Sequence, residues 1–126
     1  MDTKHGTAAL ILAAGASRRM GQMKQMLHLG GIPLLERVIR QLLYFPFSEI
    51  MCVVGHHAEQ IRANISIREE RFCWTVNANY EQGQASSLKK GLAAIHSAHV
   101  IVFLGDQPFI ANDTIRTIYE EGERRG

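Results

Sequence analysis

The chain has 126 residues, 46% of them hydrophobic and only three of them proline, which predicts one globular domain over residues 1–126 and argues against disorder. Its 14 basic and 12 acidic residues leave a formal net charge of +2 with no long block of one sign. We therefore expect neither nucleic-acid nor membrane binding, and no segment approaches the ~20 apolar residues of a membrane span.

The first half of the chain shows two strand patterns, each followed by a helix pattern. A continuous apolar run at residues 8–12 predicts a strand buried on both faces, and residues 13–21 supply the small side chains of a tight loop. Apolar residues three and four apart predict an amphipathic helix over residues 33–43. A second strand is predicted at residues 50–54, and a short helix at residues 58–65.

The same alternation continues in the second half. Residues 72–76 predict a weaker third strand, and a helix over residues 86–95 follows a polar loop. Residues 99–104 predict a fourth buried strand, which precedes a last helix over residues 113–121. Spacing within these elements selects side chains for the core: Phe72, Trp74, Leu88, Leu92, Ile95, Ile115 and Ile118.

Alternating strands and helices imply right-handed βαβ units and a doubly wound α/β fold with a mainly parallel sheet. Ligands of such sheets bind beyond the carboxyl ends of the strands, where the strand order reverses. The two loops richest in reactive residue types, at residues 13–24 and 105–108, both follow predicted strands. We expect these two loops to share one crevice.

Cysteine and histidine residues do not indicate a metal site in this chain. Cys52 and Cys73 each stand in an apolar stretch without metal-type spacing, so we interpret both as reduced core residues of a cytoplasmic protein. His56 and His57 are adjacent, and adjacent side chains diverge on an extended or turning chain. The N-terminal segment lacks the features of a signal peptide.

The loop at residues 13–24 has the composition of an anion site. Small residues let backbone amides approach a phosphate closely, while Arg19 and Lys24 can neutralise its charge. The loop fits neither the Walker spacing nor the dinucleotide pattern GxGxxG. We interpret it as a triphosphate site, with an ordinary Gly/Ala turn as the alternative. The residues that support this interpretation follow one buried strand: Ala13, Ala14, Gly15, Ser17, Arg19 and Lys24.

Two further segments contribute candidate ligands. Asp106 follows a predicted strand, and a carboxylate near bound phosphates repels them unless a divalent cation such as Mg²⁺ bridges the two. The alternative is that Asp106 begins a turn or caps a helix. Ser86 and Ser87 stand where a loop enters a helix, so either could contact a base or ribose or serve as an ordinary N-cap.

Together, three segments resemble the MobA-like nucleotidyltransferases. They are LAAGASRRMGQMKQML at residues 12–27, GQASSLKKGL at residues 83–92 and LGDQP at residues 104–108. GQASSL and GDQP resemble the molybdenum cofactor cytidylyltransferase branch, which includes accessory proteins of xanthine dehydrogenase. The guanylyl branch usually has LAGG and a CDxP-type motif at these places.

The resemblance implies a Rossmann-like nucleotide-diphospho-sugar transferase fold and transfer of CMP from CTP to a molybdopterin-type acceptor, with release of pyrophosphate. It also implies a molybdenum hydroxylase such as xanthine dehydrogenase as a partner. Arg19 and Lys24 would be the catalytic cations, and Asp106 would hold Mg²⁺. The residues that would bind the nucleotide are Leu12, Ala13, Ala14, Gly15, Ser17, Arg19, Lys24, Ser86 and Ser87.

Members of this family are usually longer than this chain. The resemblance therefore implies a C-terminally truncated fold, in which further strands, acceptor contacts and a second acidic metal ligand are missing. A sheet without its last strands leaves an unpaired edge that a homo-oligomer would cover. Two alternatives stay open: a nucleotidyltransferase for a sugar phosphate or other acceptor, and a catalytically weak NTP-binding accessory module.

Overall fold

The computed structural model describes residues 6–14, 28–29, 32–105 and 111–125. Its centre is a sheet of four parallel strands in the order β5-β4-β1-β6. The strands lie where apolar runs predicted them: β1 (Thr7–Ala13), β4 (Glu49–Val54), β5 (Phe72–Val76) and β6 (His99–Leu104).

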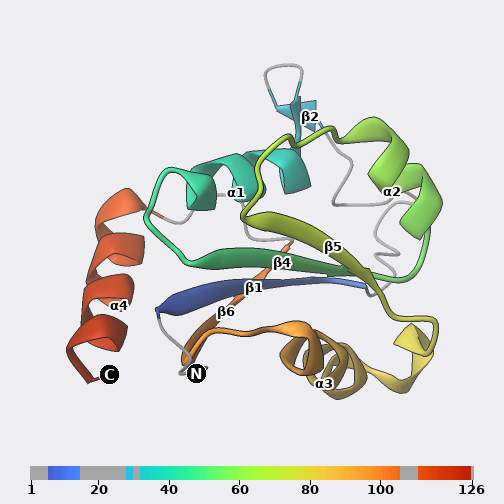
Figure 1. The fold of residues 1–126 in the computed structure, drawn as a ribbon. Coiled ribbons are helices and arrows are strands. Elements are labelled where there is room, and N and C mark those ends of the chain that lie inside the picture. The colour runs from blue at the N-terminus through green and yellow to red at the C-terminus, as the bar shows by residue number, and fades with distance from the viewer. Residues whose placement is uncertain (1–5, 15–27, 30–31, 106–110, 126) are drawn as a thin grey trace.

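Helices cover both faces of this sheet. Figure 1 shows α1 and α2 on one side of the strands and α3 on the other, which confirms the doubly wound α/β prediction. None of the described helices is long and apolar enough to cross a membrane. The helices are α1 (Leu34–Leu43), α2 (Ala58–Asn64), α3 (Gln84–Ala94) and α4 (Asn112–Arg125), with a 3-10 turn η3 (Tyr80–Gln82) and a short antiparallel pair, β2 (His28–Leu29) and β3 (Ile32–Pro33).

The strand order reverses beside β1. From β1 the chain passes outward through β4 to β5, and β6 then returns to pair with the opposite side of β1. In doubly wound sheets, the carboxyl ends of the strands at such a reversal form the crevice that receives ligands. The carboxyl ends of β1 and β6 are therefore the expected position of a site.

Alternate residues of the strands face two separate cores. Ile11 and Cys52 pack with Leu35 of α1 and Ile61 of α2 on one face, whereas the other face packs toward α3. The buried residues on the α3 side are aliphatic apart from one methionine: Ala8, Leu10, Ala14, Met51, Val53 and Ile95. This division explains why each central strand is apolar on both sides.

The inward face of α3 differs from the predicted leucine stripe. Gly91 and Ser87 are buried, whereas Leu92 is 45% exposed and Leu88 is only partly buried. A Cβ atom on Gly91 would lie 2.6 Å from Cδ1 of Leu10, so any larger residue would require the helix or the Leu10 side chain to shift. The close approach turns small residues to the sheet and leaves Leu92 outside.

β6 and α4 are more exposed than predicted. Phe103 is the buried side chain of β6, and Val102 is 44% exposed, because within the described part of the chain β6 pairs with β1 alone. In α4, Ile115 is buried as predicted, but Ile118 is 39% exposed. Both differences follow from the position of these elements at the margin of the described sheet.

The prediction that both cysteines are core residues is wrong for Cys73. Cys73 is exposed because it lies on β5, which has a single neighbouring strand among the described residues. Cys52 is buried in central β4, and burial raises the pKa of its thiol. The prediction that Phe72 and Trp74 share one face is confirmed, with ring centroids 5.0 Å apart.

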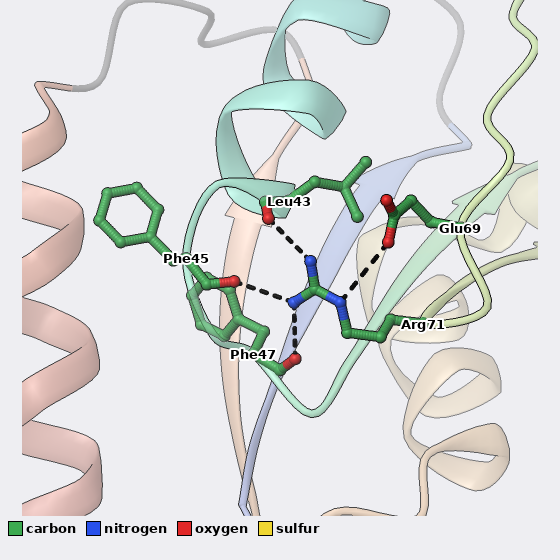
Figure 2. Close-up of polar contacts among 5 residues, drawn as sticks. All are labelled: Leu43, Phe45, Phe47, Glu69 and Arg71. Carbon is green, nitrogen blue, oxygen red and sulfur yellow. Dashed lines mark hydrogen bonds and ion pairs between the residues drawn. The ribbon is translucent and has the colours of Figure 1, made fainter.

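Arg71 joins the segment after α1 to the start of β5. Figure 2 shows its guanidinium donating hydrogen bonds to the carbonyl oxygens of Phe45 and Phe47, each at 2.9 Å, and of Leu43 at 2.7 Å. The carboxylate of Glu69 lies 3.8 Å from the guanidinium. Because the last carbonyls of a helix lack intrahelical partners, Arg71 also completes the end of α1.

Candidate functional site

The carboxyl ends of neighbouring strands are joined by backbone hydrogen bonds just past the sheet. The amide of Gly105 donates a hydrogen bond to the carbonyl of Leu12 at 3.0 Å. The amide of His56 donates to the carbonyl of Ala14, also at 3.0 Å. The chain therefore leaves β1, β4 and β6 at one rim. The first residues after β1 and β6, Ala14 and Gly105, thus lie at the same rim, in agreement with the prediction that the two loops share one crevice.

The predicted site residues divide into two groups. The described group lies on the rim and at the start of α3: Leu12, Ala13, Ala14, Ser86 and Ser87. The other group lies outside the described residues: Gly15, Ser17, Arg19, Lys24 and Asp106. The cationic and acidic parts of the prediction therefore remain predictions.

A small cavity lies between β1 and the start of α3. Its volume is about 160 Å³, and it is lined by Leu12, Ala14, Tyr80, Gly83, Gln84 and Ser87. Pockets for whole drug-sized ligands measure about 300–1,000 Å³, so this cavity suits one ring of a ligand rather than an entire nucleotide. It brings Leu12 and Ala14, at the end of β1, together with Gly83, Gln84 and Ser87, at the start of α3. Of the other described candidates, neither Ala13 nor Ser86 lines it.

The first turn of α3 is held by Asn77, and the predicted serine N-cap is wrong. Gly83 is the N-cap, with φ at 103°, and the two serines lie inside the first turn of the helix. The buried Asn77 amide donates to the hydroxyls of Ser86 and Ser87, both at 3.0 Å. Its carbonyl oxygen accepts from the backbone amide of Asn79 at 3.0 Å.

This arrangement changes what the serines can do. Ser86 also donates to the carbonyl of Asn79 at 3.2 Å, so its hydroxyl already serves the fold. The amide of Ser86 donates to the carbonyl of Gly83 at 3.2 Å, so the polar groups left for a ligand are the backbone amides of Gln84 and Ala85 and the side chain of Gln84. A helix N-terminus favours negative or electron-rich ligand groups.

Tyr80 is a wall residue of the cavity that the sequence did not predict. Its hydroxyl forms a 3.2 Å hydrogen bond with Nδ1 of His56. Its ring packs on Gly55, where an added Cβ would lie 2.6 Å from Cβ of Tyr80. A single aromatic residue in a polar loop is a weak sequence signal, although Gly55 directly after a buried strand marks a close backbone approach.

The two histidines do not diverge as predicted. Their ring centroids lie 3.9 Å apart at an interplanar angle of 73°. His57 has φ at 61°, in the left-handed region, and this backbone turn brings the adjacent rings into contact. No cluster of three or more potential metal ligands occurs among the described residues.

A larger groove of about 470 Å³ lies at the opposite end of the sheet, beside the segments that enter β4 and β5. One of its two arginines, Arg40, has partners within the fold, since it pairs with Glu36 at 2.7 Å and donates to the carbonyl of Ser66. Position favours the smaller cavity as the site, because ligands of such sheets bind at the carboxyl ends of the strands. The groove is lined by Arg40, Leu43, Tyr44, Ser66, Arg68 and Glu69.

The sequence from residue 9 to residue 126 matches the MobA-like NTP transferase domain. The chain belongs to this family. The resemblance that the three motifs indicated is thereby confirmed. The matched range includes Arg19, Lys24 and Asp106, the predicted ligands of the phosphates and the metal.

The curated proteins to which this chain is similar carry different names. The molybdenum cofactor cytidylyltransferase of Escherichia coli is 31% identical over 110 residues, covering 87% of this chain and 56% of its own length. The bifunctional protein GlmU of Desulfitobacterium hafniense is 32% identical over 114 residues, covering 88% of this chain and 24% of its own. The chain thus spans about half or less of the length of these relatives.

Solved structures of other proteins share the fold described above. Rv0371c from Mycobacterium tuberculosis is 27% identical and superposes with a TM-score of 0.83, over 97% of this chain and 62% of the mycobacterial protein. The same mycobacterial protein has been solved in complex with manganese, and that structure superposes with a TM-score of 0.76 at 24% identity.

Proposed function

We propose that this chain carries the nucleotide-binding part of a nucleotidyltransferase that transfers CMP from CTP to a molybdopterin-type acceptor in molybdenum cofactor maturation. The observation that carries the proposal is the family match over residues 9–126. The GQASSL and GDQP motifs and the 31% identity to the E. coli cytidylyltransferase support the choice of nucleotide and acceptor. The same resemblance supports a cytoplasmic location and a molybdenum hydroxylase as partner.

The cavity at the rim would receive the base or ribose of CTP. It is lined by aliphatic, aromatic and amide side chains, which suit a flat ring with polar edges. The chain leaves β1 at Ala14, on the wall of this cavity, and enters the loop that carries Arg19 and Lys24. We propose that these two cations bind the triphosphate.

The reaction needs no covalent enzyme intermediate. An oxygen of the acceptor's terminal phosphate attacks the α-phosphorus of CTP, the bond to the bridging oxygen of the β-phosphate breaks, and pyrophosphate leaves with that electron pair. Lys24 and Arg19 would stabilise the charge that moves onto the pyrophosphate.

We propose Mg²⁺ as the cofactor, held by Asp106. Mg²⁺ in nucleotide sites is commonly bound by one or two carboxylates together with phosphate oxygens, so a single acidic residue beside the triphosphate fits its requirements. Asp106 directly follows Gly105, whose amide is bonded to Leu12 at the rim. The manganese complex of Rv0371c concerns that protein and supports a divalent ion here. When bound, the ion would neutralise phosphate charge.

A pyrophosphate-release assay tests the proposal. The protein is incubated with Mg²⁺, each NTP in turn, and either molybdopterin or a sugar phosphate. Release with CTP and molybdopterin alone would support the proposal. Pyrophosphate release that requires a sugar phosphate would show that the acceptor is a sugar phosphate and not molybdopterin. NTP binding without pyrophosphate release would identify a binding module. The absence of any NTP binding would overturn the nucleotide assignment altogether.

Replacing Lys24 tests the proposed phosphate contact. We expect Lys24→Ala to lower kcat by about 100-fold or more, because the charge on the leaving group loses a positioned cation. The matched control is Lys90→Ala, which removes an exposed lysine of α3 outside the cavity lining. Circular dichroism should show both variants folded, and wild-type turnover in Lys24→Ala would contradict the role.

A further inference from the structure

We propose that His56 is a positioning residue of the nucleotide cavity, which acts by holding the ring of Tyr80 as the cavity wall. The inference rests on the proposed nucleotide function and adds a residue from a different strand-to-helix turn. It predicts that the His56–Tyr80 contact controls nucleotide affinity, although His56 itself does not line the cavity.

Tyr80 is the aromatic side chain among the residues that line the cavity. Leu12 and Ala14, which also line the cavity, are aliphatic, so Tyr80 is the aromatic surface that a flat ring could meet there. Aromatic side chains stack on nucleobases without strong preference for a particular base, because every base has a π face. The orientation of the Tyr80 ring should therefore affect binding directly.

The local structure of Tyr80 cannot fix that orientation. Tyr80 begins η3, a single 3-10 turn of three residues, and such turns are weakly stabilised. Its side chain packs against the core on the α3 side of the sheet, and its polar contact comes from the turn after β4. The Tyr80 ring packs on the Gly55 backbone, where an added Cβ would lie 2.9 Å from Cδ1 of Tyr80, and the hydroxyl bonds to His56 at 3.2 Å.

His56 is itself held from two sides. Its backbone amide donates to the carbonyl of Ala14, at the end of β1, and its ring contacts that of His57. His57 adopts the left-handed backbone conformation, which is unfavourable for every residue except glycine. Residues strained in this way concentrate at functional sites. One histidine thus connects the turns after β1, β4 and β5.

Satisfying buried polar groups does not explain this hydrogen bond. His56 and Tyr80 are both half-buried, so water can reach their polar atoms if the contact is broken. Loss of the bond should therefore change global stability little, because a group that regains water pays no desolvation penalty. Its effect should instead be seen in the position of the cavity wall.

Calorimetric titration of the whole chain with CTP and Mg²⁺ tests the inference. We expect Tyr80→Phe and His56→Ala each to weaken CTP binding by about 3- to 10-fold, the range of one net hydrogen bond. The double variant should bind no more weakly than either single variant. His56→Asn, which keeps a polar group near the position of Nδ1, should restore affinity to within about twofold of wild type.

The control is His96→Ala, which removes an exposed histidine at the amino ends of the strands. It should bind CTP as the wild type does, and thermal melting should show all variants folded. Unchanged affinity in Tyr80→Phe and His56→Ala, or additive losses in the double variant, would overturn the inference while leaving the proposed function intact. A wild-type chain that binds no nucleotide would overturn both.

Discussion

The two ends of the sheet carry polar clusters that are built in different ways. At the amino ends, one guanidinium, that of Arg71, donates to three backbone carbonyls, one at the last residue of α1 and two in the segment after it. At the carboxyl ends, the His56–Tyr80 bond joins two separate turns and the Asn77 bonds hold the start of α3, and both border a cavity. The first cluster completes the fold, and the second leaves room for a ligand.

A second amino-end cluster follows the same rule as Arg71. The carboxylate of Glu49 accepts hydrogen bonds from the backbone amide of His96 and the hydroxyl of Ser97, both at 2.7 Å, and Ser97 also contacts the hydroxyl of Ser48. These groups connect the segments that enter β4 and β6. Their bonding capacity is used within the protein, which is typical of a structural cluster.

The carboxyl end differs because of backbone direction. In a parallel sheet every following helix begins near the carboxyl end, so unpaired amides and positive helix ends gather there. The described chain adds a strained residue, His57, and a small cavity at this end. The comparison teaches that position relative to strand direction separates binding from structural clusters better than the number of polar groups does.

The largest expected effect belongs to the amino-end cluster. Arg71→Ala removes three hydrogen bonds from a charged donor, so we expect the free energy of unfolding to fall by about 3 kcal/mol, after discounting for partial exposure. Urea denaturation measures this change. Arg68→Ala, at a nearby exposed arginine, should change stability by less than about 0.5 kcal/mol. A loss of CTP affinity in folded Arg71→Ala would break the comparison.

Asn77→Ala should affect both stability and binding. It removes the donor to Ser86 and Ser87 and the acceptor of the Asn79 amide, and it leaves the Ser87 hydroxyl buried. We expect a loss of about 2 kcal/mol in stability, together with weaker CTP binding because the start of α3 is released. Denaturation and calorimetry measure the two effects. Wild-type CTP affinity in the folded variant would show that Asn77 is purely structural.

A smaller effect, of opposite sign, is expected at His57. His57→Gly relieves the left-handed backbone, and we expect a net gain of about 0.5–1 kcal/mol in the free energy of unfolding. CTP affinity should fall, since the ring that contacts His56 is lost. Ala63→Gly, within α2, is the matched control and should lose about 1 kcal/mol. Destabilisation by His57→Gly would show that no strain is stored at this turn.

The smallest perturbation tests the sheet that both clusters share. Burial raises the pKa of the Cys52 thiol in central β4, which suppresses the reactive thiolate, whereas Cys73 lies exposed on β5. Iodoacetamide should therefore add one group per native chain, at Cys73, and two after unfolding, as mass spectrometry can measure. Rapid labelling of Cys52 in the native protein would contradict the central position of β4.

The sequence by itself determined the order and type of the main elements. Apolar runs located β1 and β4, and the spacing of apolar residues located α1, because these patterns depend on neighbours along the chain. Three motifs were enough to indicate the family that the match over residues 9–126 confirms. They also brought Leu12, Ala14 and Ser87 into one candidate site, and all three line the cavity.

Only the tertiary structure decided which side chains meet across these elements. Nothing in the local sequence places Tyr80 against His56, since the two lie in different connections of the sheet. Asn77 and the serines of α3 belong to one connection, but their contact depends on how the turn between them folds back. Periodicity also favoured Leu92 for the core. In the structure Gly91 packs closely against Leu10, and Leu92 is exposed instead. Periodicity reports which residues share a face of one element, whereas the distance between two elements depends on the side chains of both.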